Sequence, residues 1–170
     1  MTRPNYLALT HAAAASLALL TVALFWAATL IVELTGTAAQ IALVKRGIVW
    51  GLAVLVPSMI AAVASGRTLV GPSPRGLPAR KLRRMLVIGP LGLLVLVPAA
   101  LVLAHWAQAG RFDTAFVAVQ TVELVAGAVN LTLLGMNFRD GLRLRAARSR
   151  AQRHAATTPV ARAASGERAA

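Results

Sequence analysis

Four long runs of apolar residues, separated by short polar breaks, take up most of the chain. They cover residues 7–34, 40–65, 85–108 and 115–138. Each run exceeds the roughly 20 apolar residues that an α-helix needs to cross a bilayer. The first run is also about twice as long as the 7–15 apolar residues of a secretory signal peptide. The pattern predicts an all-α integral membrane protein, a bundle of four transmembrane helices.

Polar residues recur inside the fourth run at alternating steps of four and three. A helix places residues at this spacing on one face. The residues of this face are Phe116, Gln120, Glu123, Gly127, Asn130, Leu134 and Asn137. A carboxylate and three amides would therefore lie on one seam inside the hydrocarbon layer, where ionisable residues usually indicate function.

The first run has a compatible face with the same spacing. Its residues are His11, Ala15, Ala18, Val22, Trp26, Thr29 and Glu33. Helix rise places polar groups of all four runs at about the same level near one membrane surface. The polar site expected there comprises Glu123, Gln120, Glu33, Lys45, Arg46 and His105, with Asn130 extending it towards mid-membrane.

Because an unpaired charge in hydrocarbon is costly, we expect these groups to pair. The predicted pairs join Glu123 to Lys45 or Arg46, and Glu33 to the other cation. A structural alternative remains open at each position. Lys45 and Arg46 can extend to the headgroups, and a polar seam can serve only to join helices through hydrogen bonds.

The net charge of +13 is concentrated on one side of the predicted bundle. That side carries the N-terminus with Arg3, a connection over residues 66–84 and a tail over residues 139–170, predicted to be disordered over about its last fifteen residues. All 18 lysines and arginines except Lys45, Arg46 and Arg111 lie there. The positive-inside rule then makes both termini cytoplasmic.

This distribution explains the basic composition by topology, so we expect no nucleic-acid binding. We expect the cations to contact anionic lipid headgroups instead. The candidate lipid-contacting residues are Arg80, Lys81, Arg83, Arg84, Arg143 and Arg145. The predicted location is the cytoplasmic (inner) membrane of a bacterium.

No motif indicates a resident cofactor or a metal, and none is expected. The chain has no cysteine, which excludes disulfides and thiolate ligands. His11 and His105 lie about a membrane apart by helix rise and cannot share one haem iron. Haem held by His11 with Met59, Met85 or Met136 remains an alternative, as does a quinone held by Gln120, Trp106 and His105.

Two glycine patterns were weighed. Gly47 and Gly51 form a GxxxG that favours close helix packing. The segment 66–73 has the glycine spacing of a phosphate-binding loop, but Pro72 stands where the lysine is needed. Nucleotide binding is therefore rejected.

Three functions stay open at this point. The leading one is a site that binds or relays a proton, an ion or a small polar solute, in a homo-oligomer or as a subunit of a larger membrane complex. The second is a non-catalytic accessory or assembly subunit whose seam docks partner helices. The third is an electron-transfer protein that binds haem or quinone. No motif names a catalysed reaction.

Overall fold

The structure is a computed structural model that describes residues 6–70 and 75–166, and all the regular secondary structure within them is helical. The elements are α1 (Tyr6–Thr35), α2 (Ala38–Val70), α3 (Leu77–Pro90), the π-helix η1 (Leu91–Leu96), α4 (Val97–Gln108) and α5 (Thr114–Gly166). Since α3, η1 and α4 follow one another directly, they form one continuous rod. Four helical rods are thus long and apolar enough to cross a membrane, as the four apolar runs predicted.

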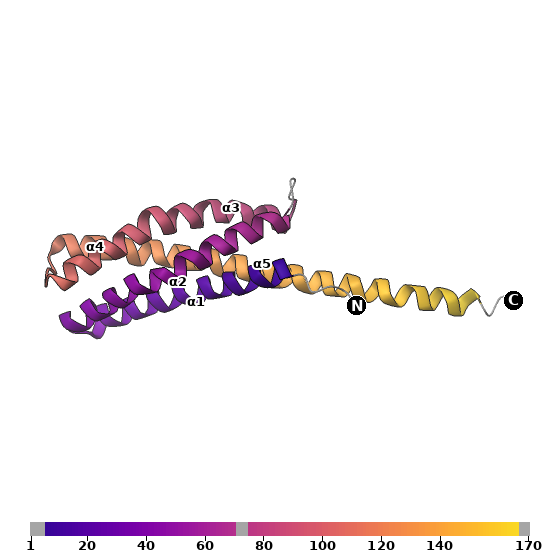
Figure 1. Cartoon of the computed structure of the whole chain (residues 1–170), viewed down its shortest axis with the longest axis horizontal. Helices are drawn as coiled ribbons and strands as arrows, with labels where there is room; N and C mark the ends of the chain where they lie inside the picture. Colours follow the sequence, from indigo (N-terminus) through magenta and orange to yellow (C-terminus); the bar gives the residue numbers. More distant parts are fainter. Residues whose placement is uncertain (1–5, 71–74, 167–170) are drawn as a thin grey trace.

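The rods run up and down in one elongated bundle, and the C-terminal part of α5 projects beyond it (Figure 1). Helix α1 packs against α2 and α5, α4 packs against α2 and α5, and α3 packs against α5. Short connections over residues 36–37 and 109–113 lie at one end, which we call the hairpin end. We call the opposite end, where α2 ends and α3 begins, the basic end.

Sequence signals explain the turn at the hairpin end between α4 and α5. Gly110 has φ +70°, a conformation that side-chain-bearing residues avoid. Asp113 caps α5, because its Oδ1 accepts a hydrogen bond of 3.0 Å from the backbone N–H of Phe116. The Arg111 guanidinium, 2.6 Å from Asp113, and this cap hold the pKa of the Asp113 carboxyl below its usual value.

Prolines in the third rod coincide with a change of helix type. Pro90 precedes the changed segment and Pro98 follows it. The segment between them, Leu91–Leu96, is π-helical, and Val97 N–H donates to Gly92 O five residues back. Proline has no N–H, and its ring would collide with the carbonyl four residues earlier in an α-helix. The wider π turn relieves this collision at Leu94.

Aromatic rings of α1 lie directly over glycines of its neighbours. A Cβ at Gly51 would lie 2.3 Å from Phe25 Cζ, and one at Gly127 would lie 2.9 Å from Trp26 Cδ1. Both contacts need glycine, since side-chain carbons do not approach this closely. Gly51 therefore serves packing as its GxxxG indicated, whereas a Cβ at Gly47 would meet nothing within 4 Å.

At the basic end, the helices extend further than the sequence predicted. Helix α2 continues to Val70 and the third rod begins at Leu77, so the connection expected over residues 66–84 is mostly helical. Helix α5 continues to Gly166, although disorder was expected over about the last fifteen residues of the tail. Alanine and arginine are strong helix formers, and an existing helix needs no new nucleus to extend. The expected polar start with Arg3, and residues 71–74 and 167–170, lie outside the described residues.

Candidate functional site

The predicted polar face of the fourth rod points into the bundle. Phe116, Gln120, Gly127, Asn130 and Asn137 are buried. Glu123 and Leu134 are half-buried on the same face. The four-three spacing therefore identified the interior of α5, and it did so because burial follows the helical period.

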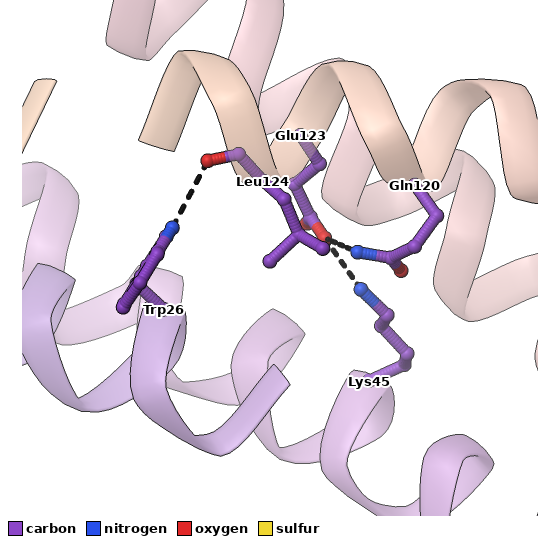
Figure 2. A network of polar contacts seen from close by, with 5 residues as sticks. All are labelled: Trp26, Lys45, Gln120, Glu123 and Leu124. Atoms are coloured by element: carbon purple, nitrogen blue, oxygen red, sulfur yellow. Dashed lines mark hydrogen bonds and ion pairs between the residues drawn. The ribbon is translucent and has the colours of Figure 1, made fainter. Parts of the chain in front are cut away.

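The centre of the site is an ion pair between α2 and α5 (Figure 2). Lys45 Nζ lies 2.5 Å from Glu123 Oε2, and the side chains of Lys45 and Glu123 are 0% and 12% exposed. Gln120 Nε2 donates a second hydrogen bond of 3.1 Å to the same carboxylate oxygen. Lys45 is one of the two partners that the sequence predicted for Glu123.

The stability of the fold depends strongly on keeping both members of such a buried ion pair. Removing two charges from water is costly, and their attraction and hydrogen bonds offset that cost only while both partners remain. Loss of one partner leaves a bare charge in the bundle, which typically costs about 3–5 kcal/mol. Lys45 and Glu123 therefore hold α2 and α5 together at one level of the bundle.

The second predicted pair, between Glu33 and Arg46, is wrong. Arg46 is exposed, and its Nη2 donates a hydrogen bond of 3.4 Å to Gln108 Oε1. Adjacent residues of a helix point about 100° apart, so Lys45 and Arg46 cannot both face the bundle interior.

The carboxylate of Glu33 is left without a cation of its own. The side chain of Glu33 is half-buried, and its buried Oε1 has no hydrogen-bond partner among the described residues. It interacts electrostatically with Lys45, attractively, and with Glu123, repulsively. Glu33 therefore lies near the Lys45–Glu123 ion pair without forming an ion pair of its own among the described residues.

His105, expected in the polar site, points away from it. Its side chain is exposed on α4, while the buried residues Leu103, Ala104 and Ala107 form the inward face. The quinone site expected at His105, Trp106 and Gln120 loses its histidine for the same reason. Within residues 6–70 and 75–166, no three His, Cys, Asp or Glu side chains gather as metal ligands would.

His11 is fixed by α2 near the basic end. Its Nδ1 lies 3.0 Å from Ala62 O and 3.2 Å from Ser65 Oγ, and its ring covers Gly66, where a Cβ would lie 2.9 Å from Cε1. These contacts give His11 a packing role between α1 and α2. Haem ligation by His11 with a methionine stays an untested alternative.

Asn130 is the most deeply buried polar group of the seam. Its side chain is 1% exposed, and its Oδ1 has no hydrogen-bond partner among the described residues. It lies beside the π-helix, since a Cβ at Gly92 would be 3.8 Å from Asn130 Nδ2. A buried carbonyl without a partner is uncommon and costly in a folded protein.

Asn130 and Glu123 line a cavity of about 610 Å³ that the sequence analysis did not predict. Helices α1, α2 and α5, together with the third rod around η1, form its walls. Its polar lining residues are Thr29, Glu123 and Asn130, and the remaining lining is largely apolar. The indole N–H of Trp26, which also lines the cavity, donates a hydrogen bond of 3.0 Å to Leu124 O (Figure 2). The sequence signal for this cavity is the set of small residues and proline in its wall, Gly89, Pro90 and Gly92, because such residues leave space between helices.

A second polar cluster, also not predicted, lies at the basic end. Asp140 is buried, and its Oδ2 lies 2.7 Å from Arg84 Nη1, which also donates to Asn137 Oδ1 at 3.3 Å. Asn137 Nδ2 donates to Lys81 O at 3.4 Å. Asp140 follows Asn137 by three residues, so the spacing of the seam could have identified it.

This cluster changes the role expected of two lipid-contacting cations. Arg84 is bound to Asp140, and Lys81 Nζ would lie 3.1 Å from a Cβ at Gly141, so both turn towards α5. Four of the expected six side chains are exposed, namely Arg80, Arg83, Arg143 and Arg145. Lipid contact by these four stays a prediction.

Comparison of the chain with protein-family models, with curated proteins and with solved structures found no match. The function is therefore argued from the geometry above.

Proposed function

We propose that the chain is an integral membrane protein whose four rods cross the bilayer with both termini cytoplasmic, and whose Glu33–Lys45–Glu123 cluster binds a proton. The observation that carries the proposal is Lys45, 0% exposed and bonded to Glu123 inside the bundle, with a second carboxylate acting on the same ammonium.

The net charge of the cluster favours the binding of one proton. With both carboxylates ionised, two negative charges face one positive charge in a region of low dielectric constant. An uncompensated charge is strongly disfavoured there. One bound proton makes the cluster neutral, so the apolar surroundings favour proton uptake.

The position of the cluster is the second argument. Glu123 lies about 14 Å along α5 from Thr114, at a rise of about 1.5 Å per residue. Glu33 is close to the end of α1 at Thr35 and is half-buried. A proton can therefore pass between water at the hairpin end and the buried pair through Glu33, without crossing the whole bundle.

Infrared spectroscopy of the protein in lipid nanodiscs tests the proposal, because a protonated carboxyl group has its own C=O stretching band. The wild-type protein should show such a band near neutral pH and lose it on titration to alkaline pH. Glu33→Gln should remove the band. Glu123→Gln should remove it too, since Lys45 then pairs with Glu33 and the cluster is neutral without a proton.

The matched control is Asp113→Asn, which removes an exposed carboxylate from the same end of the protein. It should leave the band unchanged, because Asp113 is paired with Arg111 in water. A band that persists in both glutamine variants, or a wild-type protein without one, would show that the cluster only joins helices.

A further inference from the structure

The cavity beside Asn130 is long and polar at one end only. Its lining on α2 runs from Ile48 to Ala64, about 24 Å at a rise of about 1.5 Å per residue. Thr29, Glu123 and Asn130 line the half towards the hairpin end. The half towards the basic end is lined by apolar residues such as Ile60, Val63 and Ala64. This polarity matches a chain-like molecule with one polar head.

The polar half offers hydrogen-bond acceptors. Asn130 Oδ1 has no partner, although its side chain is 1% exposed. Lys45 and Gln120 both bond to Glu123 Oε2, which leaves Glu123 Oε1 as a further acceptor among the described residues. A ligand that satisfies these oxygens must donate a hydrogen bond.

The cavity opens sideways, between α2 and η1. Ile60 and Val63 on one wall are 64% and 43% exposed, and Leu93 and Leu94 on the other are 59% and 69% exposed. In the proposed membrane location this opening faces hydrocarbon. The inference therefore rests on the membrane-spanning part of the proposed function, and the molecules that reach the opening are lipids.

We propose that this cavity binds a neutral single-chain lipid whose hydroxyl head donates to Asn130 and whose hydrocarbon chain extends from there towards the basic end, along α2. The volume of about 610 Å³ is in the range of ordinary ligand sites. An anionic head is disfavoured, because the Glu123 carboxylate lines the same half and the charge of Lys45 is already paired. The chain can be isoprenoid or straight, since both present the same chemistry.

Tryptophan fluorescence provides the test, because Trp26 lines the cavity while Trp50 is 76% exposed on α2. Two backgrounds are made, one keeping only Trp26 and one keeping only Trp50, with phenylalanine at the other tryptophans. Each is reconstituted in vesicles and titrated with a dibrominated C18 alcohol, whose bromines quench nearby indoles. Quenching of Trp26 should saturate at low mole fraction, whereas quenching of Trp50 should rise in proportion to the alcohol.

Variants then locate the bound molecule. In the Trp26 background, Val56→Phe fills the cavity wall and should abolish the saturable phase, whereas Val54→Phe, exposed and outside the cavity on the same helix, should not. Asn130→Leu should weaken binding about five- to tenfold, the loss expected for one hydrogen bond. Thr132→Val on the exposed face of α5 should change nothing.

Competition distinguishes the two sources of the chain and tests the head group. Unbrominated geranylgeraniol that displaces the probe better than hexadecanol assigns an isoprenoid ligand, and the reverse order assigns a straight chain. Displacement by palmitate as strong as that by either alcohol would contradict a neutral hydrogen-bond donor.

Two other results overturn the inference. Proportional quenching of Trp26 would mean that the cavity holds no lipid, and an unchanged affinity in Asn130→Leu would remove the head-group assignment. An unquenched Trp50 would show instead that the chain is not embedded in the bilayer, which is a failure of the proposed function.

Discussion

Two adjacent cations, Lys45 and Arg46, have opposite environments in the structure. Lys45 is completely buried against Glu123, whereas Arg46 is exposed and donates a hydrogen bond to Gln108. The difference comes from the angle of about 100° between successive helical residues. Lys45 therefore affects stability far more than its neighbour does, although both carry the same charge.

We expect Lys45→Met to destabilise the protein by about 3–5 kcal/mol, because Glu123 is left as a buried charge without its partner. The measurement is equilibrium unfolding in mixed detergent micelles. Arg46→Met is the control, and it should cost less than about 1 kcal/mol, as for exposed ion pairs and hydrogen bonds.

The double variant Lys45→Met/Glu123→Gln should recover most of the loss, since it removes both charges and keeps the shape of the pair. Equal losses in the single and double variants would mean that the contact is not an ion pair in the folded protein.

Glycine provides the second residue-level prediction. Gly127→Ala should destabilise the protein by about 1–3 kcal/mol, because the added Cβ lies 2.9 Å from Trp26 Cδ1 and displaces the indole that bonds to Leu124 O. Gly135→Ala on the same helix is the control, since its Cβ meets nothing within 4 Å. Higher helix propensity should make that variant neutral or up to about 1 kcal/mol more stable. Thermal unfolding of both in one detergent gives the comparison.

Helices α1 and α5 were predicted more completely than α2 and α4. For α1 and α5, the four-three spacing gave both the residues and the face, and residues such as Ala18, Val22, Gln120 and Asn130 are buried. For Lys45, Arg46 and His105, the sequence indicated only how far along the helix axis each residue lies. Helix rise fixes that level but not the direction of a side chain around the axis, so Arg46 and His105 were assigned to the interior wrongly.

The π-helix η1 shows a further limit of the sequence. Pro90 and Pro98 indicated a local change of backbone, but the same prolines are compatible with a kink, a break or a widened turn. Which one forms depends on packing against α5, where Gly92 lies beside Asn130. Neither the cavity nor its opening follows from apolar spacing alone.

The widened turn predicts an unusual tolerance to deletion. Removing Leu94 together with Pro98→Ala should give a regular α-helix, because a π turn holds one residue more per turn than its flanks and the colliding ring is gone. The residues before and after the deletion then keep their original directions around the helix axis. We expect a cost of at most about 2 kcal/mol, by analogy with an ordinary destabilising variant.

Removing Leu101 in the same Pro98→Ala background is the control, since it lies in regular α4. That deletion rotates one side of the rod by about 100° and exposes buried residues such as Leu103, so it should abolish folding. Circular dichroism and size-exclusion chromatography measure the two outcomes. Equal failure of both deletions would contradict a widened turn.

At the scale of the whole molecule, the two ends of the bundle differ in charge. The hairpin end pairs Arg111 with Asp113, whereas the basic end exposes Arg80, Arg83, Arg143 and Arg145. Asp140 pairs with the inward-facing Arg84 there. Helix α5 carries further arginines beyond the bundle (Figure 1). Under the positive-inside rule, we expect this asymmetry to place the basic end on the cytoplasmic side of the membrane.

The chain has no cysteine, so single cysteines can test that orientation directly. Ala109→Cys marks the hairpin end and Ala146→Cys marks α5 at the basic end, and both positions are exposed. A membrane-impermeant maleimide added to intact bacterial cells should label Ala109→Cys and leave Ala146→Cys unlabelled. After permeabilisation both should react, which controls for accessibility. Labelling of Ala146→Cys alone in intact cells would reverse the orientation and place Glu33 near the cytoplasm, so that protons would reach the Lys45–Glu123 pair from that side.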